Sequence, residues 1–81
     1  METRESVLAK LSKVVEMKES FGLLSGDFGR WKILVNEESL AFSVKEFSFA
    51  SYLISDILSI DVGNSAIMVE ITETSNAVFW R

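Results

Sequence analysis

The chain has neither cysteine nor histidine, and these two absences remove much of the chemistry that small proteins commonly use. Without cysteine no disulfide can form, and without either residue zinc and most other transition-metal sites are disfavoured. The commonest general base and the best thiol nucleophile are missing as well. We therefore expect no bound metal, no cofactor and no enzymatic activity from this chain alone.

Positive charge is also scarce. No lysine or arginine occurs between Glu46 and Trp80, and the whole net charge of −4 arises in residues 21–81, because the charges of residues 1–20 balance. Nucleic-acid binding needs basic groups to neutralise phosphates, and anionic membranes attract the same groups. The charge pattern therefore predicts no direct binding to nucleic acid and no adhesion to a membrane.

No segment has the pattern of a leader or of a membrane span. The longest uncharged run near the middle, residues 47–55, is far shorter than the ~20 residues that a spanning helix needs. Residues 1–5 lack the basic and then apolar run of a signal peptide. Together with the absence of cysteine, these features predict a cytoplasmic protein.

Apolar residues are abundant and make up 48% of the 81 residues. This length predicts one domain, residues 1–81, which buries only roughly 60–65% of its unfolded surface. Some apolar surface should therefore stay exposed on a monomer, and such patches usually mark an interface. We expect a protein partner, with a second copy of the chain as the first candidate. The alternative is a tightly filled core with scattered surface leucines.

Residues 4–19 are predicted to form a helix. Apolar residues recur at helical spacing along this segment, and Thr3 is suited to cap its first turn. The glycine in Ser20-Phe21-Gly22 ends the helix. A glycine-rich connection is expected over residues 22–29.

Two hairpins are predicted from apolar segments separated by polar turns. A further turn is expected at Gly63-Asn64. In the first hairpin, residues 31–35 pair with residues 39–42, and residues 36–38 form the turn. In the second, residues 66–72 pair with residues 77–80, and residues 73–76 form the turn.

Residues 43–59 fit two structures. As a helix, the segment has one apolar face and begins with a capping-box pattern at 43–46. The strand interpretation is supported by the aromatic and β-branched residues of the segment and by the alternation of apolar and polar residues over 58–62. It requires a turn near Asp56, however, and no Gly or Pro lies between Gly29 and Gly63. The helical interpretation is favoured. Its apolar face consists of Phe47, Ala50, Leu53, Ile54, Ile57 and Leu58.

The favoured fold is a small α+β domain of order α-β-β-α-β-β, with an antiparallel sheet and both helices on one face. The alternative is an N-terminal helix followed by an all-antiparallel small sheet or barrel of five or six strands. A shift of 36 residues aligns residues 35–42 with 71–78 at three identical positions. This similarity suggests a duplicated αββ unit, although any two amphipathic αββ segments share such a pattern.

Two short motifs and one set of acids could suggest functional sites. Residues 22–29 resemble a phosphate loop, but they follow a predicted helix and lack the Lys-Ser/Thr pair after the last glycine. Residues 61–65 offer oxygens to Ca²⁺ but lack the bidentate glutamate, so a plain turn is expected. Four acids could form a carboxylate pair, although solubility charges are the favoured interpretation. They are Asp56, Asp61, Glu70 and Glu73.

The candidate partner-binding residues are three aromatics, Trp31, Phe79 and Trp80. Trp31 opens a predicted strand, and the other two lie in the last one. A closing strand either packs in the core, which is favoured here, or offers an edge to a partner. In the second case Phe79 and Trp80 are the natural anchors.

The sequence therefore predicts a non-catalytic protein–protein interaction or assembly module that self-associates. The alternative is an acidic inhibitor or mimic that occupies a basic groove on a nucleic-acid-handling protein, suggested by the base-free stretch between Glu46 and Trp80. A carboxylate-only or metal-assisted enzyme is the least favoured hypothesis.

Overall fold

Helix α1 (Arg4–Leu11) opens the computed structural model, which describes residues 1–71 and 75–81. Its start is set by local hydrogen bonds. The N–H of Ser6 donates to the Thr3 hydroxyl, and the N–H of Thr3 donates to the Ser6 hydroxyl, so the two residues cap the helix reciprocally. The predicted helix start at residue 4 is confirmed.

The helix ends earlier than predicted, so the prediction of helix for residues 12–19 is wrong. After a turn, the chain crosses β2 (Leu23–Phe28) at Gly26. A Cβ on Gly26 would lie 2.5 Å from Val15 Cγ1 and 2.9 Å from the Glu16 carbonyl oxygen. Val15 is buried at this crossing, and its burial against β2 decides where the helix stops.

Gly26→Ala is therefore expected to destabilise the protein by about 1–3 kcal/mol, because the added methyl group overpacks the crossing. Thermal unfolding followed by circular dichroism should show a Tm lowered by roughly 4–8 °C per kcal/mol. Gly63→Ala is the matched control, because its Cβ would approach nothing closer than 3.5 Å. Equal Tm values for the two variants would contradict the close crossing.

The first sheet is an antiparallel meander that confirms the predicted hairpin at residues 31–42. The predicted connection over residues 22–29 is wrong, because it contains β2, and Phe21-Gly22 forms a tight turn with positive φ at both residues. The sheet has five strands in the order β1 (Lys18–Ser20), β2, β3 (Trp31–Val35), β4 (Ser39–Val44) and β5 (Phe47–Leu53).

The second sheet has three strands and follows a 3-10 turn, η1 (Ile54–Asp56). The predicted turn at Gly63 is confirmed, because its N–H donates to the Ala66 carbonyl at 2.9 Å. The predicted strands are confirmed over residues 66–71 and 77–80. Residues 72–74 lie outside the described residues, and Asn76 of the predicted turn already belongs to the last strand. The strands are β6 (Ile57–Val62), β7 (Ala66–Ile71) and β8 (Asn76–Trp80).

The predicted second helix over residues 43–59 is wrong, because β5, η1 and β6 lie there. Ile54, Ile57 and Ile60 are all buried at a spacing of three, which imitates a helical face. The spacing arises from the 3-10 turn and from a register shift between Ile57 and Ser59. The α-β-β-α-β-β order and the duplicated αββ unit are therefore wrong. The α+β class is confirmed in its alternative form of one helix and antiparallel strands, with eight strands in the described residues where five or six were predicted.

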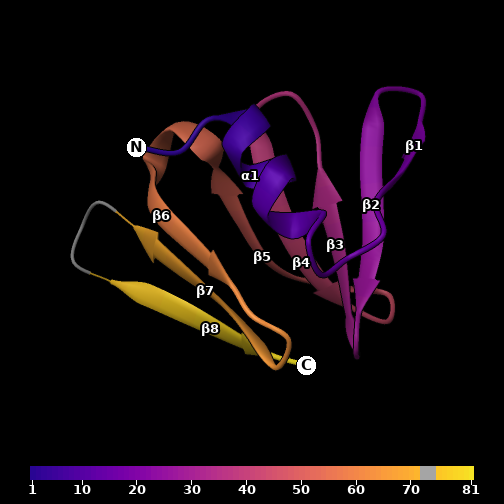
Figure 1. The fold of residues 1–81 in the computed structure, drawn as a ribbon. Helices are drawn as coiled ribbons and strands as arrows, with labels where there is room; N and C mark the ends of the chain where they lie inside the picture. Colours follow the sequence, from indigo (N-terminus) through magenta and orange to yellow (C-terminus); the bar gives the residue numbers. More distant parts are fainter. Residues whose placement is uncertain (72–74) are drawn as a thin grey trace.

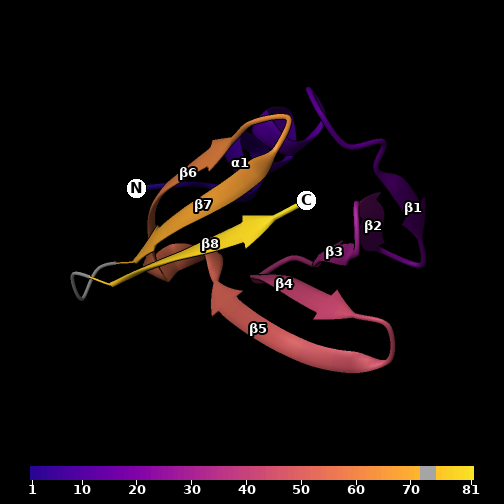
Figure 2. The same ribbon diagram turned by 90° about the horizontal axis from the view of Figure 1, so that it is seen from below.

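The two sheets enclose one hydrophobic core, with α1 lying across it (Figure 1). Seen from below, the chain curves from β1 to β5 and returns through β6 to β8 (Figure 2). Phe42 of β4 stacks on Phe79 of β8 with ring centroids 3.8 Å apart. The fully buried side chains of largest volume come from the helix and from both sheets: Phe28, Phe42, Phe79, Leu11, Ile33, Leu40, Ile57 and Ile67.

Candidate functional site

An aromatic cluster joins the two sheets at the end of the molecule where the chain terminates. Trp31 of β3 lies at its centre and is 8% exposed. Its ring meets Phe79 edge-on with centroids 5.1 Å apart, and its indole N–H donates to the Trp80 carbonyl oxygen at 2.8 Å. This buried donor is thus satisfied, as a buried tryptophan requires.

The structure places the three predicted partner-binding residues in two different environments. Trp31 and Phe79 lie in the core, where the favoured interpretation of the last strand put Phe79. Trp80 is 64% exposed, so its side chain is accessible to a partner. Trp31 brings the three residues together, because its ring contacts Phe79 and its indole N–H binds the Trp80 carbonyl. Their role as partner anchors stays a prediction.

Two exposed phenylalanines on β5 were missed by the sequence analysis. Phe47 is 75% exposed and Phe49 is 67% exposed. The ring of Phe49 packs against Trp31, with centroids 5.1 Å apart, and thereby extends the buried aromatic cluster to the surface. The alternation of aromatic residues with Ser48 and Ser51 is a strand signal that could have identified this surface, but the helical interpretation obscured it.

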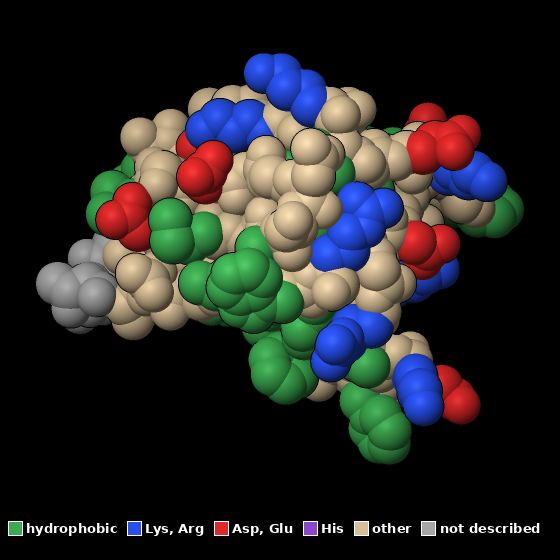
Figure 3. Space-filling view, turned by 60° about the horizontal axis from the view of Figure 1, so that its bottom comes forward, with side chains coloured by type: hydrophobic (Ala, Val, Ile, Leu, Met, Phe, Trp, Pro, Cys, Tyr) green, Lys and Arg blue, Asp and Glu red, His purple; other side chains and the backbone are tan. Residues whose placement is uncertain are grey.

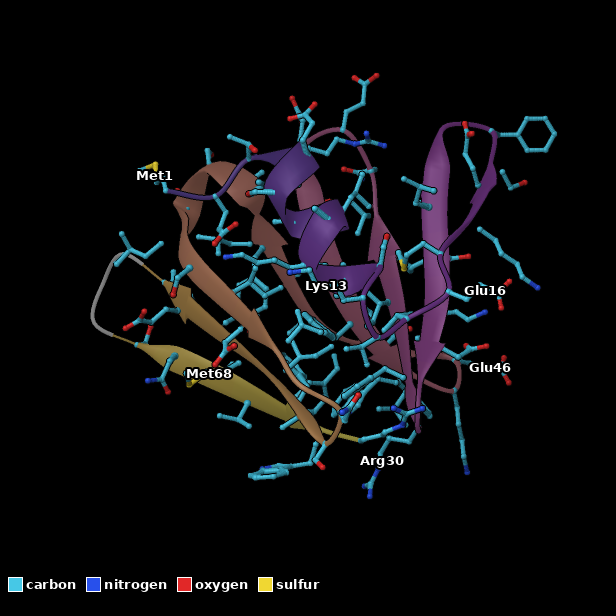
Figure 4. All side chains as sticks on the ribbon, in the orientation of Figure 1. Met1, Lys13, Glu16, Arg30, Glu46 and Met68 are labelled. Atoms are coloured by element: carbon cyan, nitrogen blue, oxygen red, sulfur yellow. The ribbon has the colours of Figure 1, made fainter. Side chains whose placement is uncertain are left out.

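A second apolar area lies on the outer face of the second sheet. Met68 is opposite Val78 in the strand register, and Trp80 follows at the end of the same strand. These three side chains line a shallow hollow together with the turn at residues 63–65. In the space-filling view from below, hydrophobic side chains gather on one face, next to lysine and arginine side chains (Figure 3). Figure 4 shows Met68 on the second sheet and Arg30 at the lower end of the molecule.

A polar network around Glu2 fastens the N-terminal segment to β6. The Glu2 side chain is only 7% exposed, and its carboxylate accepts hydrogen bonds from Lys10 Nζ at 2.6 Å and from the Ile60 N–H at 3.2 Å. The Ser6 hydroxyl donates to the same carboxylate, and Lys10 Nζ also donates to the Ile60 carbonyl. The Glu2 N–H donates to the Ile57 carbonyl at 3.1 Å.

These contacts set the ionisation of Glu2. Burial acts to raise the pKa of its carboxyl group, but the hydrogen bonds from Lys10, Ser6 and Ile60, with the positive charge of Lys10, outweigh burial and hold the pKa below the ordinary value of 4.5. The stabilisation is therefore fully present above pH 4.5 and is lost as the pH falls through the lowered pKa.

Glu2→Gln is expected to lower the free energy of unfolding by about 1–3 kcal/mol at pH 7, because Lys10 and the Ile60 N–H lose their charged partner. The difference from the parent protein should shrink as the pH falls below 4.5, where the parent loses the same interaction. Urea unfolding at pH 7 and at acid pH measures both effects. Glu5→Gln, which changes an exposed acid of helix α1, is the control, and its free energy of unfolding should stay within about 0.5 kcal/mol of the parent's. A gap that widens on acidification would contradict the network.

The residues considered for catalysis or metal binding do not converge. The part of the chain that the structure describes contains no group of three or more acids close enough to hold a metal ion. Glu70 accepts a hydrogen bond from the Ser59 hydroxyl, Asp56 and Asp61 are exposed, and Glu73 lies outside the described residues. Paired-carboxylate chemistry stays the least favoured hypothesis.

Comparison with known proteins gives no match: no protein-family model, no curated protein and no solved structure is similar to this chain. Over residues 1–71 and 75–81, no helix has the length and apolar character needed to cross a membrane. The function must therefore be inferred from the surface of the molecule itself.

Proposed function

We propose that this chain is a non-catalytic protein–protein interaction or assembly module that self-associates. The observation that carries the proposal is the number of exposed apolar side chains. Ten large hydrophobic residues are exposed in the described part of the chain, although fifteen others already form a buried core. Monomeric soluble proteins rarely leave contiguous apolar patches of this kind uncovered.

The exposed residues are grouped, which distinguishes them from ordinary scattered surface leucines. Phe47, Phe49 and Leu53 belong to β5, and two of these are aromatic. Met68 and Trp80 belong to the outer face of the second sheet. Aromatic residues and methionine are enriched at the centres of protein interfaces, so both groups have the composition of a contact surface.

The solution mass, measured by light scattering behind size exclusion at low salt and at ~1 M salt, tests self-association. We expect a dimer at both salt concentrations, because apolar contacts are not screened, whereas exposed charge pairs are screened within ~3 Å at 1 M. A monomer at every concentration would overturn the proposal. A dimer that dissociates at high salt would show that charge, not apolar surface, holds the copies together.

An acidic inhibitor or mimic is the second candidate, and one surface feature favours it. Phe21 is fully exposed at the tip of the β1–β2 hairpin, beside a hollow that Glu37 and Glu38 also line. An apolar tip among acids is complementary to a groove with a basic rim. Binding to nucleic-acid-handling proteins with basic grooves, measured at low salt and at ~1 M salt, tests this candidate. Binding that persists at high salt would rule it out.

A further inference from the structure

The two sheets end in four edge strands, β1 and β5 in the first sheet and β6 and β8 in the second. An unprotected edge presents a row of unpaired backbone N–H and C=O groups, which is a template for a strand of another chain. Natural proteins protect such edges with charges, with very short strands or with a covering segment.

The edge of β6 is covered by the N-terminal segment. Its Ile57 carbonyl accepts from the Glu2 N–H, its Ile60 N–H donates to the Glu2 carboxylate, and its Ile60 carbonyl accepts from Lys10. Three backbone groups of this edge, at Ile57 and Ile60, are therefore already hydrogen-bonded within the chain, so β6 offers no continuous free row.

Two further edges are protected in other ways. Strand β1 has only three residues and carries the charges of Lys18 and Glu19. The end of β8 is held against the first sheet, because the Trp80 carbonyl accepts from the Trp31 indole and Phe79 stacks on Phe42. Strand β1 therefore offers no long uncharged row of backbone groups. Strand β8 is uncharged but has only five residues, and its Trp80 carbonyl is already hydrogen-bonded.

Strand β5 has none of these three protections, although it carries a β-bulge, a further device that blunts sheet edges. It has seven residues, Phe-Ser-Phe-Ala-Ser-Tyr-Leu, without charge and without proline, and no strand lies on its outer side in the described residues. It forms the outer rim of the first sheet in Figure 2. A register shift opposite Phe42 and Ser43 bulges Phe49 and aims its ring at Trp31, which bends the strand but adds no charge to it.

A second copy of the chain fits this edge better than a charged partner does. An uncharged strand is complementary to itself, and antiparallel pairing about a two-fold axis makes every contact twice. If the two-fold axis passes beside Ala50, Ala50 lies opposite its own copy, and the one-to-one register holds only on the C-terminal side of the bulged Phe49.

The exposed aromatic surface of β5 supplies about half of the area that a small stable interface needs. Phe47 and Phe49 are 75% and 67% exposed, which corresponds to roughly 300 Å² of aromatic surface per copy. Two copies thus bring together roughly 600 Å², about half of the ~1,200 Å² at the lower end of stable interfaces. Leu53, the serines between the aromatics and the backbone of both strands supply the remainder.

We infer that β5 pairs antiparallel with β5 of a second copy, centred on Ala50, and joins the two five-stranded sheets into one continuous sheet. This inference rests on the proposed function, because it names the surface through which the module self-associates. In the dimer, the bulged Phe49 lies at the interface and covers the aromatic cluster of Trp31 and Phe79.

The absence of cysteine from the chain makes single-cysteine crosslinking a clean test. The full chain is prepared as Ser48→Cys, Ala50→Cys, Ser51→Cys and Leu53→Cys, and disulfide-linked dimer is measured under mild oxidation. Ser20→Cys on β1 and Asn76→Cys on β8 are controls at exposed positions of two other edges. Ser51→Cys guards against misfolding of Ala50→Cys, because its side chain is exposed and the change is nearly isosteric.

Crosslinking is expected to be strongest at Ala50 and to fall away towards both ends of the strand, because residues that face one another in a ladder lie within disulfide range. Pairing holds the two thiols at an effective concentration near ~1 mM, so crosslinking at about 10 μM protein should be about a hundredfold faster than in the controls. A dimer by mass whose β5 variants crosslink no faster than the controls overturns the edge pairing and leaves self-association standing. A monomer by mass overturns both.

Discussion

Phe79→Ala is expected to lower the free energy of unfolding by about 3–5 kcal/mol. Phe79 is 1% exposed, stacks on Phe42 across the two sheets and meets Trp31 edge-on. Its removal leaves a cavity between the sheets, which no neighbouring backbone can close without moving a strand. Because small domains are stable by only ~5 kcal/mol at the lower end of the usual range, much of the variant should be unfolded in water.

Urea unfolding followed by circular dichroism measures this loss, and Trp80→Ala is the control from the adjacent position. The Trp80 side chain is 64% exposed, and the hydrogen bond that Trp80 accepts from Trp31 uses its backbone carbonyl, which alanine keeps. The control should therefore stay within about 1 kcal/mol of the parent. Similar losses for the two variants would contradict the assignment of Phe79 to the core and Trp80 to the surface.

Phe47→Lys is expected to convert the dimer to a monomer at micromolar concentrations. Phe47 is 75% exposed in a single copy, so the substitution should leave the stability of the monomer within about 0.5 kcal/mol. In the paired edge it removes an apolar contact from each copy and places two lysines in the interface. The loss is about 3 kcal/mol or more per dimer, which raises Kd more than a hundredfold.

Sedimentation or light scattering over a range of concentrations gives the Kd of both proteins. Phe21→Lys is the matched control, because Phe21 is also an exposed phenylalanine, but lies at the tip of the β1–β2 hairpin. It should leave the dimer unchanged and weaken only a contact made by the hairpin. If Phe21→Lys dissociates the dimer and Phe47→Lys does not, the copies associate through the hairpin tip and not through β5.

The two substitutions thus separate the two surfaces that could serve a binding module. The β5 edge is uncharged and suited to a second copy, whereas the hairpin tip lies beside Glu37 and Glu38 and is suited to a basic partner. Both surfaces lie outside the buried core, so either can change without loss of the fold.

The sequence by itself determined the features that depend on neighbouring residues. Thr3 caps the first helix through Ser6, three residues away, and the polar turn at residues 36–38 lies between two strands that pair directly. The turn at Gly63 follows from the same local logic. These features were predictable because the contacts that make them span only a few residues. The α+β class and the start of the first helix followed from them, whereas the favoured second helix was wrong.

Only the tertiary structure decided where the first helix ends and what residues 43–59 become. The helix stops because Val15 is buried against β2 at Gly26, a contact with a strand that lies further along the chain. Ile54, Ile57 and Ile60 have helical spacing, but a 3-10 turn and a register shift produce it within extended chain. The same hydrophobic spacing fits a helix and this interrupted pair of strands. The pairing of β5 with β4 and of β6 with β7 therefore decides between them. The same pairing exposes Phe47 and Phe49 at an edge, whereas the helical interpretation placed Phe47 on a buried apolar face.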